Sequence, residues 1–238
     1  RLNIVNFIYY FWNNRLLLKY FMCGIFVIFS KKKKLNRAKC LKSLKKLYSR
    51  GPDHTKFQFL HNQKLFIANT VLSITGNPPK SRKLFCSKNR RNYISFNGEI
   101  YNYNELKNKN FSFLKKNVTD TEVLVNLYQK FSHTSIPEKL NGMFAYVIFD
   151  KLKKKLIIVN DVQGEKNLYY FEDNEYYIVS STIKSILSFI QKPKLNLITL
   201  KNYFYTRHFM PINMTPFKKI KLYDNGISMT YSLRNFKK

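Results

Sequence analysis

Acidic residues are scarce in this 238-residue chain, which has 13 Asp and Glu against 43 Lys and Arg and a formal net charge of +30 at pH 7. A surface this basic attracts nucleic acids and anionic membranes. The sequence, however, carries no helix-turn-helix, zinc-finger or RNA-binding signature. The lysines are spread over the whole chain and accompany abundant Asn, Ile, Phe and Tyr, which all have A- and T-rich codons. We therefore attribute the charge to base composition and expect no specific nucleic-acid partner.

Cysteine is also scarce. Cys23, Cys40 and Cys86 are an odd number of cysteines and include no Cys-x-x-Cys pair. They offer no disulfide framework, which favours a reducing compartment, and we expect a cytoplasmic protein. The four histidines lack the spacing of metal ligands, so we expect no metal site.

The first 22 residues lack the features of a membrane anchor or a secretion signal. Their longest uncharged run, Leu2–Asn14, is shorter than the ~20 residues that span a bilayer. They have no basic amino-terminal region and no small-residue cleavage site. Two interpretations stay open: translated sequence upstream of a true start at Met22, which we favour, or a propeptide removed before Cys23. In both, residues 1–22 are absent from the mature protein, and no membrane is involved.

The hydrophobic pattern predicts a folded domain. Its 45% hydrophobic content, with 17 Tyr and 21 Phe, excludes a disordered chain. Helical spacing predicts a helix over 35–48, and the capping-box pattern of Thr119 and Glu122 predicts a second one to about Phe131. The expected strands are 23–29, 93–96, 143–149, 155–159, 168–171 and 176–179. Asn97-Gly98 suits a tight turn at the end of one of them. Together these elements indicate an α+β fold with antiparallel sheets.

Cys23 directly follows a potential initiator methionine, in Met22-Cys23-Gly24-Ile25-Phe26. If Cys23 were the first residue, it would carry both a nucleophilic thiol and an α-amine whose unperturbed pKa is roughly 7.7–8.0. Such an amine can take the proton of the thiol near neutral pH. Alone, such a pentapeptide is more commonly a buried strand with a structural cysteine.

Further motifs follow Cys23 in a fixed order: Arg50-Gly51-Pro52-Asp53, Asn97-Gly98-Glu99-Ile100-Tyr101-Asn102, Thr119-Asp120-Thr121-Glu122 and Leu140-Asn141-Gly142-Met143-Phe144-Ala145. Together they resemble the class II glutamine amidotransferase domain, and specifically the amino-terminal half of glutamine-hydrolysing asparagine synthetases. The resemblance runs from Met22 to about Tyr231. It implies the four-layer αββα sandwich of N-terminal nucleophile hydrolases over residues 23–191. Residues 192–238 are similar to the connector that leads into the ATP-using domain of asparagine synthetases.

The resemblance implies that the chain hydrolyses the side-chain amide of glutamine. Cys23 would attack the amide carbon, and its own α-amine would relay the proton to the departing ammonia. The side-chain amide of Asn97 and the backbone N–H of Gly98 would donate to the oxyanion. Glu99 and Asp120 would hold the α-amino group of glutamine. The resemblance also implies that Ile74 and Thr75 bind glutamine. It assigns Arg50 and Asp53 to the wall of the pocket.

The sequence departs from the family pattern at Val71. Val71-Leu72-Ser73-Ile74 stands where the family has Arg-Leu-Ser-Ile, whose arginine binds the α-carboxylate of glutamine. Valine cannot form this charge-assisted pair. At about 1.5–3 kcal/mol for each hydrogen bond to a charged group, its loss should weaken substrate capture by roughly 10²–10⁴-fold unless a nearby lysine substitutes. An impaired or regulatory module with the amidotransferase fold is therefore the alternative function.

The sequence also lacks any loop that could bind ATP. Neither Ser-Gly-Gly-x-Asp-Ser nor Gly-x-x-x-x-Gly-Lys is present. We therefore expect no cofactor in this domain, with ATP and magnesium belonging to a synthetase domain outside this chain. The expected partners are glutamine and the synthetase domain or subunit that receives ammonia. Whether the chain is a fragment of a longer synthetase, which the connector favours, or a separate glutaminase stays open, as does a homodimer.

Overall fold

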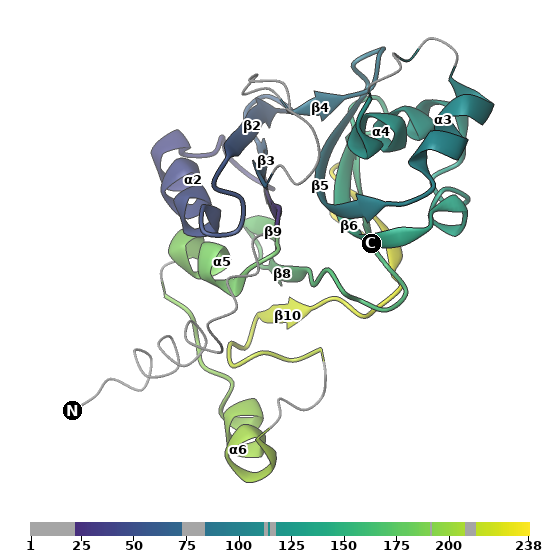
Figure 1. The fold of residues 1–238 in the computed structure, drawn as a ribbon. Helices are drawn as coiled ribbons and strands as arrows, with labels where there is room; N and C mark the ends of the chain where they lie inside the picture. The colour runs from purple at the N-terminus through teal and green to yellow at the C-terminus, as the bar shows by residue number, and fades with distance from the viewer. Residues whose placement is uncertain (1–21, 73–83, 112–113, 115–117, 191, 208–212) are drawn as a thin grey trace.

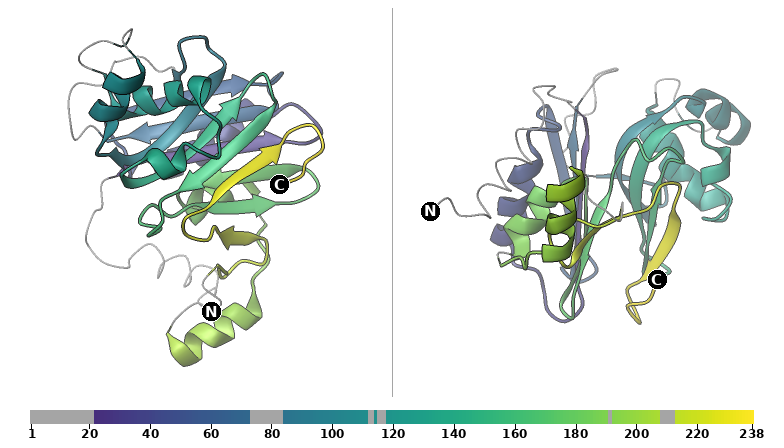
Figure 2. Two further views of the ribbon diagram at one scale, coloured as in Figure 1. Left: turned by 90° about the vertical axis from the view of Figure 1, so that its right-hand side faces the viewer. Right: turned by 90° about the horizontal axis from the view of Figure 1, so that it is seen from below.

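Two antiparallel β-sheets face each other across the centre of the fold (Figure 2). The computed structural model describes residues 22–72, 84–111, 114, 118–190, 192–207 and 213–238. The first sheet, sheet A, has the strand order β10-β8-β9-β1-β3-β2. Its strands are β1 (Gly24–Ser30), β2 (His54–Leu60), β3 (Leu65–Val71), β8 (Tyr169–Glu172), β9 (Tyr176–Ser180) and β10 (Ile220–Leu222).

The second sheet, sheet B, has the strand order β11-β7-β6-β5-β4. Its strands are β4 (Phe85–Cys86), β5 (Asn92–Ile100), β6 (Gly142–Asp150), β7 (Lys155–Asn160) and β11 (Ser228–Ser232). The two last strands of the chain divide between the sheets, because β10 pairs with β8 and β11 pairs with β7. The residues similar to a connector therefore add one strand to each sheet.

Strand β1 lies inside sheet A and is buried along its whole length. Side chains alternate between the two faces of a strand. Ile25 and Val27 accordingly pack against sheet B, whereas Phe26 and Ile28 pack against helices on the outer face. Because both faces of β1 are covered, its sequence reads as one continuous apolar run, as predicted for residues 23–29.

Helices cover the outer face of each sheet (Figure 1). Helices α2 (Arg37–Leu44) and α5 (Ile183–Ile190) pack on sheet A, and α3 (Tyr103–Asn110) and α4 (Asp120–Lys130) pack on sheet B. The four layers confirm the expected αββα sandwich. Helix α6 (Leu197–Thr206) extends away from these layers in Figure 1, and two short 3₁₀ turns are η1 (Lys45–Leu47) and η2 (Pro137–Lys139).

The capping box predicted at the start of α4 is present. The Glu122 N–H donates to Thr119 Oγ1 at 3.2 Å, and the Thr119 N–H donates to Glu122 Oε2 at 3.1 Å. These two bonds satisfy donors that a helix start otherwise leaves unpaired. The helix predicted over 35–48 is also found, as α2 followed by the tighter turn η1.

The tight turn predicted at Asn97-Gly98 was wrong. Strand β5 continues through both residues to Ile100, with Gly98 opposite Phe144 of β6. Gly98 has a φ of +148°, and a Cβ atom there would lie 2.1 Å from the Met143 carbonyl oxygen. Glycine is thus required by the close approach of β6, and the pairing with that strand overrides the local turn preference.

Candidate active site at the start of strand β1

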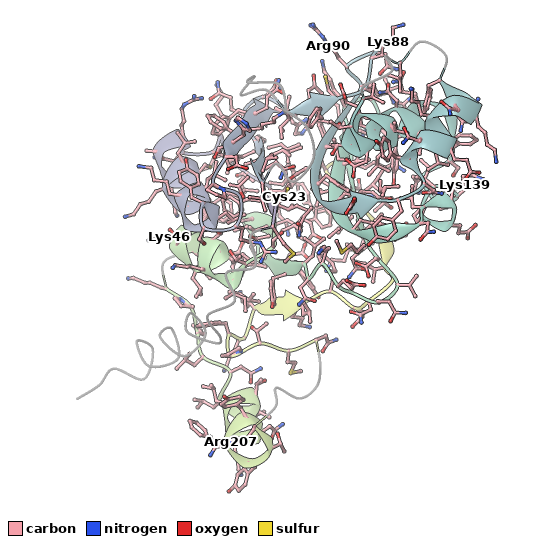
Figure 3. All side chains as sticks on the ribbon, in the orientation of Figure 1. Cys23, Lys46, Lys88, Arg90, Lys139 and Arg207 are labelled. Carbon is pink, nitrogen blue, oxygen red and sulfur yellow. The ribbon has the colours of Figure 1, made fainter. Side chains whose placement is uncertain are left out.

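Cys23 immediately precedes β1 and is half-buried, and its label lies near the centre of the molecule in Figure 3. Its thiol donates to the Leu72 carbonyl, with 3.8 Å between sulfur and oxygen. Burial raises the pKa of the thiol, and the charge of Asp120 raises it further, whereas that of Arg50 lowers it. The thiol is therefore protonated at neutral pH and needs a base before it can attack a carbonyl carbon.

Arg50 holds the backbone on both sides of the Met22–Cys23 bond. The Met22 N–H donates to the Arg50 carbonyl at 2.8 Å, and Arg50 Nε donates to the Cys23 carbonyl at 3.3 Å. Gly51 lets this segment approach β3, because a Cβ there would lie 2.5 Å from the backbone of Thr70. The structure thus brings Arg50 to the site, whereas Asp53 is exposed.

Asn69, which the sequence analysis did not single out, joins three strands at this point. Its Nδ2 donates to the Gly24 carbonyl at 3.0 Å, and its Oδ1 accepts from the Phe96 N–H at 2.8 Å. One side chain therefore spans from the start of β1 to the residue before Asn97. The signal that could have identified it is an asparagine inside the otherwise apolar Leu65–Val71 strand.

The Asn97 side chain points into the protein with an unused donor. Asn97 is only 1% exposed, and its Nδ2 has no hydrogen-bond partner within the described part of the chain. Leaving a buried donor unpaired costs about 1–3 kcal/mol. Such a donor, next to Gly98, which has no side chain to block a ligand, is suited to binding an oxygen atom of a ligand.

Two carboxylates lie at the start of α4 and the end of β5. Asp120 accepts from the Ile100 N–H at 3.2 Å and from the Thr121 N–H at 2.6 Å. Burial raises the pKa of Asp120, these N–H donors lower it, and the neighbouring Glu99 raises it. Glu99 is exposed. Within the described ranges no three His, Cys, Asp or Glu side chains are grouped so that they could hold a metal ion.

Val71 is half-buried at the end of β3, opposite His54 of β2, and next to the Leu72 carbonyl that faces the thiol. The position therefore lies close to the Cys23 thiol, although it carries no charge. Ile74 and Thr75 lie outside the described residues.

Lys56 is a second feature that the sequence analysis missed. It pairs with Asn69 across β2 and β3, is 1% exposed, and its Nζ has no hydrogen-bond acceptor among the residues that the structure describes. The ammonium lies 3.8 Å from the centroid of the Phe85 ring, a cation–π contact that offsets only part of the desolvation cost. Only the strand register, not composition, could have shown that this lysine faces inward.

Replacing Lys56 by methionine should stabilise the fold by about 1–3 kcal/mol at pH 7, because it removes a buried ammonium while keeping the packing. Burial lowers the pKa of Lys56 in the folded state. The charged Lys56 therefore destabilises the fold fully below that folded-state pKa. This destabilisation decreases as the pH rises toward the ordinary value of about 10.4 and is absent above it. Denaturant unfolding at pH 7 and above pH 10.4 measures this, with the exposed Lys42→Met as control. A loss of stability at pH 7 would contradict it.

No helix in the described part of the chain combines the length and apolar character needed to cross a membrane. In Figure 3 the labelled Lys46, Lys88, Arg90, Lys139 and Arg207 lie at the periphery, whereas Cys23 lies inside.

Comparison with solved structures shows that the fold occurs in known proteins. Two solved structures share the fold: a glutamine phosphoribosylpyrophosphate amidotransferase from B. subtilis (TM-score 0.52, 22% identity, covering 69% of this chain and 43% of that one) and an allosteric regulatory enzyme of purine biosynthesis (TM-score 0.56, 20% identity, covering 70% and 43%).

Two relatives with higher identity are named as glutamine-hydrolyzing asparagine synthetases. One from Methanocaldococcus jannaschii is 35% identical over 184 residues, covering 70% of this chain and 35% of the relative. Asparagine synthetase 2 of Bacillus subtilis is 34% identical over 149 residues, covering 61% and 19%. The chain spans 19–38% of the length of eight curated relatives that it matches. A glutamine amidotransferase domain model matches residues 22–238, and the chain therefore belongs to the glutamine amidotransferase domain family.

Proposed function

We propose that this chain, once Cys23 is its first residue, hydrolyses glutamine and supplies the ammonia for an asparagine synthetase. The observation that carries the proposal is the buried amide of Asn97, whose Nδ2 is unpaired within the described part of the chain. Asn69 links this strand to the start of β1, where Cys23 lies. A thiol that needs a base and a donor that lacks an acceptor lie at the same end of the two sheets. This combination fits acyl transfer at a carbonyl carbon.

In the proposed reaction, the neutral α-amine of Cys23 takes the thiol proton as sulfur attacks the δ-carbon of glutamine. The carbonyl oxygen becomes an oxyanion that accepts from Asn97 Nδ2 and the Gly98 N–H. The amine then passes its proton to the nitrogen of the breaking C–N bond, so ammonia leaves and a γ-glutamyl thioester remains. Water attacks the thioester, giving its proton to the amine, and glutamate leaves as the thiol is restored.

The two carboxylates have a separate role in this proposal. Asp120 and Glu99 bind the α-ammonium of glutamine, which orients the side-chain amide toward the thiol. Asp120 is half-buried and accepts hydrogen bonds from two backbone N–H groups, so it is held in one position. No cofactor is needed for this half of the reaction. The ATP-dependent amidation of aspartate belongs to a synthetase domain or subunit that receives the ammonia.

Ammonia release from glutamine by the chain started at Met22 tests the proposal. Cys23→Ala should abolish ammonia release. Cys86 is a half-buried cysteine on β4, and Cys86→Ala should leave the release intact. The second candidate, a binding or regulatory module, is favoured by the valine at position 71. It predicts that the unmodified mature chain neither releases ammonia nor forms a thioester that mass spectrometry can detect.

Val71→Arg should lower the KM for glutamine by about 10–100-fold, because one charge-assisted interaction with the α-carboxylate is worth about 1.5–3 kcal/mol. The position favours this outcome, since Val71 adjoins the carbonyl that faces the Cys23 thiol. Steady-state kinetics of Val71→Arg are compared with those of Val71→Met, which adds length without charge. An equal KM in the two variants would mean that the carboxylate is bound elsewhere.

A further inference from the structure

Lys166 makes a contact beside the nucleophile that the mechanism above does not use. Its Nζ lies 3.1 Å from the thioether sulfur of Met22, across 144 positions of sequence. Lys166 is only 6% exposed. A thioether is a weak hydrogen-bond acceptor, so it compensates an ammonium poorly. The partner is also temporary, because Met22 must leave before Cys23 can have a free amine.

The loop that carries Lys166 is fixed without help from Met22. The buried Asp161 carboxylate accepts from the Glu165 N–H at 3.0 Å, from the Lys166 N–H at 3.3 Å and from the Phe144 N–H of β6 at 3.3 Å. The Asp161 carbonyl also accepts from the Gly164 N–H at 2.9 Å. This network holds the backbone of Lys166 against sheet B, so loss of Met22 removes a side-chain contact but not the loop.

Removal of Met22 turns the nitrogen of Cys23 into an amine close to this ammonium. The Met22 sulfur is three bonds from its Cα, so standard bond lengths put the Lys166 Nζ within roughly 9 Å of that nitrogen. Like charges at this separation, in partly buried surroundings, disfavour each other. A protonated amine would have to sit near the Lys166 ammonium, whereas a neutral amine would not.

We propose that in the mature chain Lys166 keeps the Cys23 α-amine in its neutral, proton-accepting form, and so is a positioning residue for the base. This inference rests on the proposed function of Cys23 as an amino-terminal nucleophile. The other charges facing the site act in both directions. Arg50 adds a second positive charge at the Cys23 carbonyl, while Asp120, itself beside Glu99, favours the protonated amine. Tyr169, which lies near Arg50, is uncharged at neutral pH.

The expected effect is a shift in pH dependence. An amine with the ordinary pKa of roughly 7.7–8.0 is about 10–20% neutral at pH 7. If Lys166 lowers that pKa by about one, the neutral fraction at pH 7 rises to about half or more. Lys166→Met should therefore move the acidic limb of kcat/KM upward by about one pH unit and lower kcat/KM at pH 7 by about fivefold, with little loss at pH 9.

The experiment compares mature chains, beginning at Cys23, that carry Lys166, Lys166→Met or Lys166→Arg. Lys153→Met is the matched control, since it removes the same charge from an exposed turn at the far end of sheet B. The arginine variant should keep the limb of the parent chain. Equal losses at every pH, with no movement of the limb, would overturn the proposal and leave Lys166 a structural residue.

A second readout does not depend on glutamine turnover. The pH dependence of Cys23 alkylation by iodoacetamide, followed by peptide mass spectrometry, reports how readily the thiol loses its proton in the mature chain. Lys166→Met should shift this dependence to higher pH, and an unchanged dependence would overturn the proposal. Cys40 is an internal control, because burial raises its pKa to about 12. A shift in alkylation together with no ammonia release from the parent chain would support the role of Lys166 and refute the proposed function alone.

Discussion

A chain that keeps Met22 attached to Cys23 should release ammonia from glutamine at least about 10²–10⁴-fold more slowly than the mature chain, the range attributed to a positioned general base. The nitrogen of Cys23 is then part of a peptide bond and has no usable proton affinity. The thiol pKa is raised by burial, so no other group on Cys23 can compensate. The fold itself should persist, because β1 begins at Gly24, after the bond in question.

The sharpest comparison uses one sample before and after a cut. A removable domain is fused to the amino terminus of the chain so that its cleavage leaves Cys23 as the first residue. Glutaminase activity is measured before and after this cleavage. Intact mass and amino-terminal sequencing verify each state. Equal activity in the uncut sample would contradict the assignment of the α-amine as base. A thermal unfolding curve on both samples separates loss of the base from loss of structure.

The same measurement distinguishes the two interpretations of residues 1–22. If they are upstream sequence, a chain started at Met22 loses its methionine, since cysteine is small, and is active at once. If they are a propeptide, the chain started at Arg1 matures by cleavage between Met22 and Cys23. Sequencing of the two purified proteins shows which of them begins at Cys23.

Local sequence patterns predicted those parts of the fold that depend on local interactions. The capping box of α4 was correct because the two hydrogen bonds of Thr119 and Glu122 lie within four residues. Strand β1 was recognised because a run buried on both faces is apolar throughout. Strands β2 and β3 were not predicted, since polar residues such as Lys56 and Asn69 interrupt their inward face.

Features that depend on pairing between distant strands could not be predicted from local patterns. Asn97-Gly98 has the composition of a turn, yet β6 pairs alongside both residues and keeps them extended. The motifs identified Cys23, Asn97 and Asp120 as candidate site residues. They could not show that Asn97 Nδ2 lacks a hydrogen-bond partner within the described part of the chain, because that depends on the residues packed around it. The contact between Lys166 and Met22 likewise joins residues that only the sandwich brings together.

Asn97→Ala should lower kcat by about 10²–10³-fold while changing KM little, because an oxyanion donor acts on charge that develops only in the transition state. Its Nδ2 has no hydrogen-bond partner among the residues that the structure describes, so the substitution breaks none of the hydrogen bonds found there. The loss of activity should therefore exceed anything that the change in stability could explain.

Asn92 supplies a matched control on the same strand. It is also 1% exposed, and its Nδ2 is likewise unpaired within the described part of the chain, but it lies at the opposite end of β5 from Asn97. Asn92→Ala should disturb the core to a similar degree and leave kcat within about threefold of the parent, since it removes no group near the reacting atoms. Steady-state kinetics and unfolding curves of both variants test this pair. A rise in KM alone for Asn97→Ala, or equal losses of kcat in the two variants, would exclude Asn97 as the oxyanion donor and make its buried amide a purely structural feature.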